Sequence, residues 1–258
     1  MINYKAVIEY DGTNFYGFQI QPGGLRTVQG EIVKVLSLIF NKETKIAYAG
    51  RTDAGVHALN QVINFKSEEE LDLYKFKWSL NSLLPDDISV RFITREADTF
   101  DSRRDALWRE YSYFVVNDNY QNVFLKKYSI LVCKKLNLDL MIKGSKAFIG
   151  KKDFSSFCSP NDENENKIRE IFDFEIFKKN IFGINEILVF KIKANSFLYN
   201  MVRIIVGTLL EIGKGVRDIS TIDYAFKNNS RDLAGKIVEA KGLFLTGAGY
   251  KGINSFIT

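Results

Sequence analysis

The stretch AGRTDAGVHALNQV (residues 49–62) is the part of this sequence around which the rest is arranged. It lies between two segments of strand-like composition, and Gly50 and Gly55 let the backbone turn tightly on either side of Asp53. An aspartate in such a turn commonly accepts hydrogen bonds from backbone N–H groups, which would give Asp53 a structural role. Arg51 favours a second interpretation, because a nearby cation stabilises the ionised carboxylate. Position 53 is therefore either a turn-forming aspartate or a catalytic carboxylate.

The segments around this loop have the periodicity of a small α+β domain. Alternating apolar residues predict strands, and apolar residues at helical spacing predict helices. Thr27 is placed to cap the first helix, whose predicted buried stripe is Val28, Ile32, Val35 and Ile39. The predicted elements are strands at 4–10, 45–49, 61–65, 88–94 and 107–117, with helices from residue 28 and through 73–83, the second stopping at Pro85. Their order, strand–helix–strand–strand–helix–strand, is that of a ferredoxin-like fold with an antiparallel sheet.

The second half of the chain contains similar ingredients in a looser order. It predicts a helix at 138–149, a polar loop at 160–167, strands at 168–178 and 181–194 joined at Lys179-Asn180, helices at 197–212 and 222–227, and a last strand at 243–250. At 258 residues the chain is near the size at which one hydrophobic core divides. We predict an α+β fold of two ferredoxin-like (RRM-like) subdomains, 1–120 with the Asp loop and 135–258 with the Arg203 helix, whose antiparallel sheets form a central cleft.

Arg203 is a cation within a helix that is apolar around most of its circumference, so that helix should be largely buried. A buried guanidinium requires a partner, because an unpaired buried charge is very costly. The residues one helical turn away are Tyr199, Asn200, Val206 and Gly207, none of which is an acid. The partner must therefore come from elsewhere in the fold or from a ligand, unless the side chain extends to solvent.

Tyr111 lies on a predicted strand, where it shares a face with Arg109. An aromatic ring beside a cation is a platform on which a nucleobase can stack, although packing between strands explains the same pattern. Arg103 and Arg104 add to a local basic group that would meet phosphates, or else form a solvated surface.

Composition and motif content narrow the classes of function. The net charge of +5 and pI of about 9.0 suit a polyanionic partner. Cys133 and Cys158 are far apart and in no metal-binding pattern, which predicts reduced thiols in the cytoplasm. The sequence has no signal peptide, no apolar run that spans a bilayer, no Walker loop, no dinucleotide fingerprint and no metal-ligand spacing, so we expect no cofactor and no metal. His57 is either a structural residue or a general acid–base.

Ordered motifs along nearly the whole chain resemble the tRNA pseudouridine synthases of the TruA type. They are YDGTNFYGFQIQP with TVQ, AGRTDAGVHALNQV, NSLLPDDISV, REYSYFV, KDFSSF, FLYNMVRIIVGTLLEIGKG and GLFLTGAGY. The sequence departs from the family pattern at Asp101-Ser102, where His-Ala is usual. It departs again at residues 239–241, where a segment containing proline is usual. Both departures fall in loops that we expect near the site, where they would change how RNA is bound, or which tRNA position is modified, more than the chemistry.

The resemblance implies an isomerase that converts uridine to pseudouridine in the anticodon stem-loop of tRNA, at positions 38, 39 or 40. It implies that Asp53 acts on a uridine flipped out of the stack, either as a nucleophile or as a base. It also implies that Arg203 pairs with Asp53, that Tyr111 stacks on the flipped base and that Arg51 helps to hold the RNA open. Arg103, Arg104 and Arg109 are the further RNA contacts that we expect. The resemblance also predicts a homodimer.

Two other classes of function fit parts of the same sequence. Basic charge and surface aromatics would equally suit a non-catalytic RNA-binding module. A nucleotide-binding metabolic enzyme is the third class.

Overall fold

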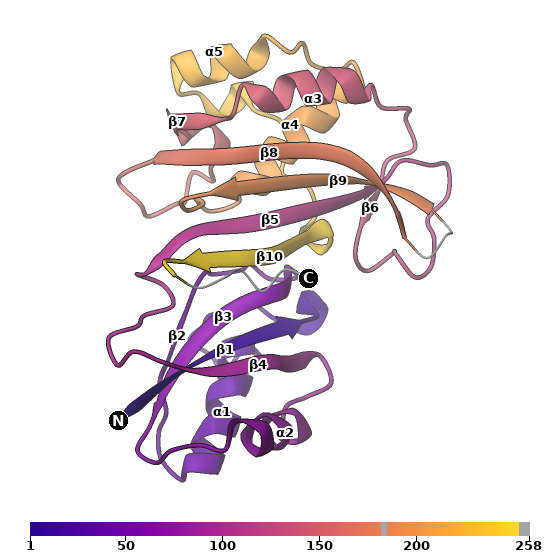
Figure 1. Cartoon of the computed structure of the whole chain (residues 1–258). Coiled ribbons are helices and arrows are strands. Elements are labelled where there is room, and N and C mark those ends of the chain that lie inside the picture. The colour runs from indigo at the N-terminus through magenta and orange to yellow at the C-terminus, as the bar shows by residue number, and fades with distance from the viewer. Residues whose placement is uncertain (182–184, 253–258) are drawn as a thin grey trace. The chain divides into compact units, whose positions relative to one another are not determined.

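The computed structural model describes residues 1–181 and 185–252, and its fold is α+β as predicted (Figure 1). The chain forms two compact units. Unit 1 comprises Met1–Arg109 and Phe244–Thr258, and unit 2 comprises Glu110–Leu243. Within the described residues, no helix is both long enough and apolar enough to cross a membrane.

Unit 1 has the strand–helix–strand–strand–helix–strand order that the sequence predicts. Its elements are β1 (Ile2–Tyr10), α1 (Val28–Phe40), β2 (Ile46–Tyr48), β3 (His57–Ser67), α2 (Leu73–Leu83) and β4 (Ile88–Glu96). The strand β1 lies between β4 and β3 and is antiparallel to both, while β2 pairs antiparallel with β3. This β4-β1-β3-β2 arrangement is ferredoxin-like.

A strand from the far end of the sequence completes the unit 1 sheet. The strand β10 (Leu243–Tyr250) runs parallel to β3, with Phe244 opposite His57. The strand β2 pairs with a different part of β3, where Ile46 lies opposite Phe65. The strands β2 and β10 therefore pair with different parts of β3, and the Asp53 loop joins the end of β2 to the start of β3.

The two helices of unit 1 cover one face of its sheet. Thr27 caps α1 as predicted, because its hydroxyl accepts a hydrogen bond from the Gly30 N–H at 3.2 Å. Phe40 of α1 stacks on Phe76 of α2 at 5.5 Å between ring centroids, and both rings contact Phe65 of β3. The predicted stripe of α1 was wrong at one position. Ile39 is only half-buried, and Leu36 is fully buried instead.

Unit 2 contains the other strands of this sheet, with helices packed against them. The strand β5 (Ala106–Val116) begins in unit 1 and continues into unit 2, where the sheet order is β5-β9-β8-β7. The other elements are β6 (Ile130–Leu131), α3 (Leu138–Lys146), β7 (Gly150–Asp153), β8 (Ile168–Ile181), β9 (Asn185–Ala194), α4 (Met201–Gly213) and α5 (Thr221–Asn228). A cluster of aromatic rings joins β8 to α5 through Phe148, Phe157, Phe174 and Phe226. Burial of such rings is the main stabilising contribution to a core of this kind.

Several predicted boundaries differ from the structure, and β3, for example, begins at His57 and not at residue 61. The helix predicted from residue 197 begins at Met201, because Asn200 has a left-handed backbone (φ 61°) that no helix can include. The turn predicted at Lys179-Asn180 was also wrong, because both residues lie within β8. The division between the two compact units falls between Arg109 and Glu110, within β5, and again between Leu243 and Phe244, at the start of β10.

Candidate active site

The Asp53 loop (residues 49–56) joins β2 to β3, and hydrogen bonds fix its backbone along its length. At its start, the side chain of Gln61 both donates to Gly50 O at 2.7 Å and accepts from Gly50 N at 3.3 Å. At its centre, the carbonyl of Thr52 accepts from Phe18 N at 3.0 Å. After the turn, Val56 N donates to Asp53 O at 3.1 Å. The half-buried side chain of Asp53 is thus carried by a backbone with little freedom to move.

The segment at residues 10–18 lies directly against this loop and supports it. Tyr10 and Thr52 share a hydrogen bond of 2.7 Å between buried hydroxyls. Gly12 approaches so closely that a Cβ atom there would lie 2.0 Å from Val56 O. Gly17 has φ +94°, and a Cβ atom there would lie 2.9 Å from Thr52 O. The motif YDGTNFYGF therefore accompanies the Asp53 motif because the two segments pack against each other.

Tyr10 offers a test of this support. Burial raises the pKa of Tyr10 well above its ordinary value, and hydrogen bonds with Thr52 and Gln61 oppose that shift without reversing it, so the hydroxyl stays protonated. Tyr10→Phe keeps the ring and leaves the buried Thr52 hydroxyl without this partner. We expect a loss of about 1–3 kcal/mol in the free energy of unfolding. Urea denaturation measures it, and Tyr16→Phe, on an exposed ring of the same unit, is the control. Equal stability of the two variants would contradict this role.

His57 is buried beside the loop. Its Nδ1 accepts a hydrogen bond from Gly12 N at 3.0 Å and lies 3.1 Å from a carboxylate oxygen of Asp11. Its ring stacks on Phe244 of β10 at 4.5 Å between centroids. These contacts link the support segment to β3 and β10, so they favour the structural interpretation of this histidine.

Arg26 connects the segment at residues 10–18 to the start of β4 and to α1. Its guanidinium makes two parallel hydrogen bonds to Asp87, at 2.7 and 2.8 Å, and a third to Glu31 at 3.1 Å. It also lies over the ring of Phe15, 4.1 Å from the centroid. The hydrogen bonds that Arg26 donates to Asp87 raise the pKa of Arg26 further, so the cation is permanent. Asp87 belongs to the motif NSLLPDDISV, which thereby has a structural role in the same region.

The arginines predicted as RNA contacts in unit 1 have different surroundings. Arg51, Arg103 and Arg104 are exposed. Arg109 is half-buried and donates to three backbone carbonyls, those of Ala49 at 2.9 Å, residue 106 at 3.0 Å and residue 103 at 2.6 Å. Arg109 thus ties the start of the Asp53 loop to the turn that carries the other two. These contacts give Arg109 a structural role that its sequence position did not reveal.

The turn at residues 101–105 contains one of the departures from the family pattern. A carboxylate oxygen of Asp101 accepts from the backbone N–H groups of Arg103 and Arg104, both at 2.9 Å. Ser102 is fully buried, and its carbonyl accepts from the hydroxyl of Tyr250 at 2.7 Å. This pair of residues therefore builds the turn and displays the two arginines.

Tyr111 and Arg203 belong to unit 2. Tyr111 is buried, at 7% exposure, and its ring meets the ring of Phe197 edge to face at 5.1 Å. Arg203 is half-buried on α4, where its Nε donates to Val238 O at 2.8 Å and its Nη1 donates to Asn200 Oδ1 at 2.7 Å. Both of these acceptors are neutral. The structure thus places Asp53 in one compact unit and Tyr111 and Arg203 in the other, and the Asp53–Arg203 ion pair stays a prediction.

The segment at residues 235–242 lies along α4 beside Arg203. A Cβ atom at Gly207 would lie 1.9 Å from the carbonyl oxygen of Lys236, so only glycine permits this approach. Arg203 holds the carbonyl of Val238, and Tyr113 holds the next one, donating to Glu239 O at 2.7 Å. The departure at residues 239–241 therefore begins at the carbonyl that Tyr113 holds, one residue after the carbonyl that Arg203 holds.

Asn200 is the residue of this region that sequence reasoning missed. It was assigned to the interior of a helix, whereas it precedes α4 and its amide oxygen holds Arg203. Asparagine tolerates the left-handed conformation better than most residues. An asparagine before the apolar run was therefore the available signal.

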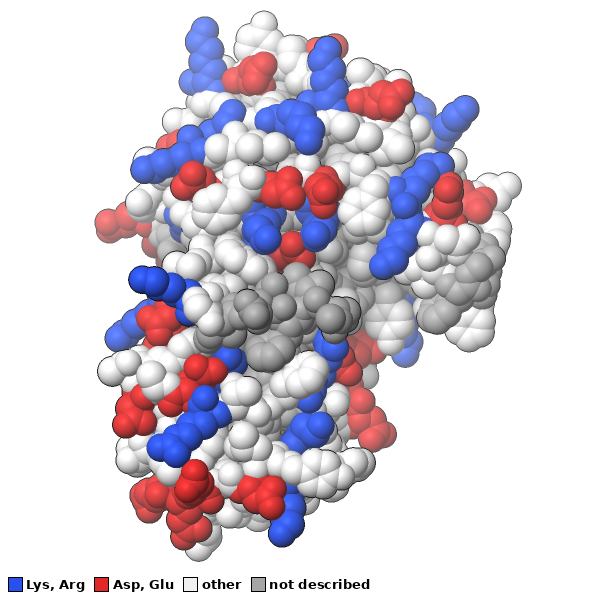
Figure 2. Space-filling model, viewed as in Figure 1, with Lys and Arg blue, Asp and Glu red and all other residues white. Residues whose placement is uncertain are grey.

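Charge and metal-binding patterns add little to this site. On the face shown in Figure 2, Lys and Arg are interspersed with Asp and Glu in each unit, so no single-sign patch marks a binding surface on that face. Among the described residues, no group of three or more His, Cys, Asp or Glu is arranged to hold a metal ion.

Comparison with known proteins identifies the class. The family model described as tRNA pseudouridine synthase matches residues 6–103 and 145–251. "tRNA pseudouridine synthase A 2" of Bacillus cereus is 39% identical over 95% of this chain and 98% of its own length. "tRNA pseudouridine synthase A" of a Geobacillus species is 40% identical over 93% of this chain and 95% of its own. A solved Cbf5–Nop10–Gar1 complex aligns with a TM-score of 0.36 at 12% identity, and the alignment covers 95% of this chain and 59% of that one.

These matches and the α+β fold define an RNA-modifying isomerase. The chain belongs to the tRNA pseudouridine synthase family, whose members convert uridine to pseudouridine in tRNA.

Proposed function

We propose that this chain isomerises uridines in the anticodon stem-loop of tRNA, at positions 38, 39 or 40. The observation that carries the proposal is the Asp53 loop, a half-buried carboxylate on a backbone fixed from both sides, within a family match over most of the chain. A fixed carboxylate suits catalysis because the free energy of positioning is supplied by the fold and not by the reaction.

In the proposed reaction, the target uridine leaves the base stack and enters the site. Asp53 acts either as a nucleophile or as a base, and the N1–C1′ glycosidic bond breaks. The uracil rotates, C5 forms a new bond to C1′, the C5 proton passes to solvent and N1 gains a proton. Substrate and product therefore have the same composition, and the overall step consumes no co-substrate.

The remaining predicted residues have assigned roles in this proposal. Arg203 pairs with Asp53 and keeps its carboxylate ionised. Tyr111 stacks on the flipped uracil. The edge-to-face contact with Phe197 sets the plane of the Tyr111 ring. The exposed Arg51, Arg103 and Arg104 contact RNA phosphates. Arg109 supports that surface through the backbone of residue 103.

The proposal extends to assembly and location. We propose that the chain acts as a homodimer in the cytoplasm. Its described residues contain two free cysteines, exposed Cys133 and buried Cys158, which suits a reducing compartment.

Release of tritium from tRNA labelled at C5 of uridine tests the activity and its position together. We expect release from full-length tRNA and from an anticodon stem-loop RNA, because C5 loses its proton when it bonds to C1′. We expect no release from the same stem-loop with cytidine at positions 38–40. Release from that control RNA would overturn the position. Binding of every RNA with no tritium release from any of them would favour a non-catalytic RNA-binding module.

A further inference from the structure

A polar loop of unit 2 is connected to Arg203 through a chain of hydrogen bonds. The polar loop comprises residues 158–167, between 3-10 helix η2 (Ser155–Phe157) and β8. The connection begins at Asn200, whose amide oxygen accepts from Arg203 Nη1 at 2.7 Å and whose amide nitrogen donates to Ser159 Oγ at 2.8 Å. The amide of Asn200 is therefore held at both ends, and its orientation sets the direction of the bond to the guanidinium.

The polar loop also fixes the backbone that carries Asn200. Asp162 Oδ2 accepts from the N–H of Tyr199 at 2.6 Å, and the N–H of Ser159 donates to the carbonyl of Tyr199 at 3.0 Å. Both backbone groups of the residue before Asn200 are thus bound by one loop. A left-handed residue costs energy unless its surroundings hold it, and these two bonds do so.

Asp162 is built into the loop as a permanent anion. Its side chain is 2% exposed and accepts from Lys167 Nζ at 2.8 Å. Asn164 donates to the same oxygen from its backbone and from its side chain, both at 2.9 Å. Burial opposes ionisation, but the hydrogen bonds from Lys167, Tyr199 and Asn164 outweigh it and hold the pKa of Asp162 well below its usual range.

We propose that Asp162 is a positioning residue for Arg203, acting through the backbone of Tyr199 and the side chains of Ser159 and Asn200. The proposal rests on the proposed function of Arg203. The polar loop holds the guanidinium in one direction, and Asn200 is the residue that connects the loop to it. A guanidinium that loses this direction still carries its charge but spends less time in the productive geometry.

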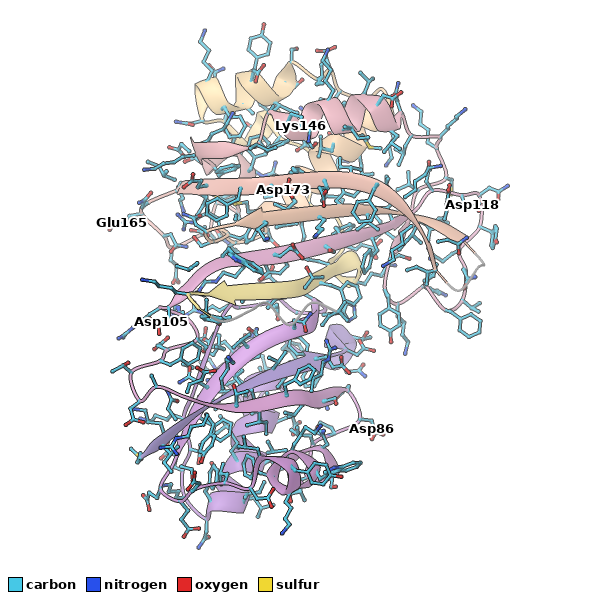
Figure 3. The ribbon with its side chains drawn as sticks, in the orientation of Figure 1. Asp86, Asp105, Asp118, Lys146, Glu165 and Asp173 are labelled. Carbon is cyan, nitrogen blue, oxygen red and sulfur yellow. The ribbon has the colours of Figure 1, made fainter. Side chains whose placement is uncertain are left out.

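The substitutions that test this are Asp162→Asn and Asn200→Gly, with Glu165→Gln as the control. Asp162→Asn keeps the size of the side chain and removes its charge. Asn200→Gly removes the amide, and glycine adopts the left-handed backbone without strain, so this variant keeps the turn. Glu165 lies in the same polar loop with an exposed side chain that points away from the sheet (Figure 3).

Steady-state kinetics by tritium release give the expected result. For each of the two substitutions kcat should fall on the order of tenfold to a hundredfold while KM for tRNA stays within about twofold, because orientation matters for reaction more than for RNA binding. The double variant should lose little more than either single one, since both act on the same bond. Glu165→Gln should match the wild type.

Three results separate the outcomes. A wild-type protein without tritium release overturns the proposed function. Full activity of Arg203→Ala overturns the role of Arg203 but leaves the isomerase. If the wild type is active and Arg203→Ala is not, three outcomes overturn the positioning inference. Asn200→Gly could keep the wild-type kcat, or the double variant could show a fall in kcat equal to the product of the two single falls. In the third outcome, Asp162→Asn loses activity only in proportion to a fall in Tm.

Discussion

Asp53→Asn is expected to abolish pseudouridine formation while leaving tRNA binding nearly unchanged. The amide has almost the same size as the carboxylate, so the hydrogen bonds that hold the Asp53 loop, which involve its backbone and that of its neighbours, stay in place. An amide is neither a useful nucleophile nor a base at neutral pH. We expect kcat to fall by at least about a thousandfold, which corresponds to about 4 kcal/mol in activation free energy. Tritium release measures the rate, and a filter-binding titration measures the affinity for tRNA.

The matched control is Asp86→Asn in the same unit, at an exposed aspartate whose side chain points outward (Figure 3). That variant should retain full activity. The catalytic assignment fails if Asp53→Asn retains a rate close to that of the control. It also fails if activity disappears only together with tRNA binding, because that would indicate an RNA contact and not a group in the reaction.

Gly12→Ala is expected to damage both stability and catalysis, although position 12 is not assigned to the reaction. A Cβ atom there would lie 2.0 Å from Val56 O. That oxygen belongs to the backbone, so it cannot move aside as the end of a flexible side chain would. Forcing such a contact costs about 1–3 kcal/mol in the free energy of unfolding, equivalent to a fall in Tm of about 2–12 °C. The backbone that yields belongs to the Asp53 loop, so kcat should fall as well, and by more than the loss of folded protein explains.

Gly23→Ala is the control for this substitution. Gly23 has φ +86°, so alanine is strained there by about 1–2 kcal/mol, but nothing lies within 4 Å of the added atom. If the two variants lose similar stability but Gly12→Ala loses more kcat than Gly23→Ala, the effect of Gly12 lies in the Asp53 loop. Wild-type kcat in the folded fraction of Gly12→Ala would show that the loop does not depend on this contact.

Features that depend on neighbours in the chain were predicted well. The cap at Thr27 and the stripe of α1 follow from side chains within one or two helical turns, and only the last position of that stripe was wrong. The strands around the Asp53 loop follow from alternation. Their ferredoxin-like order follows from the strand–helix–strand–strand–helix–strand succession of the elements.

Features that depend on distant partners were not accessible in this way. Arg109 has the sequence context of an RNA contact, yet it binds the carbonyl of Ala49, which only the folded sheet brings near. The start of α4 was misplaced because the helix-like spacing of apolar residues extends upstream of residue 200. The polar loop holds Asn200 in a left-handed conformation, so the helix begins only after it.

The sequence by itself determined the family and the α+β class, and it predicts the catalytic role of Asp53, because each is encoded in an ordered local motif. The tertiary structure decided how the Asp53 loop is held. Its supports are Gly12, Gln61 and Arg109, and Phe244 of β10 stacks on the adjacent His57. The physical reason is that a carboxylate in a turn becomes a fixed chemical group only through bonds to segments far away in the chain. The motif identifies the carboxylate, and the tertiary structure fixes its position.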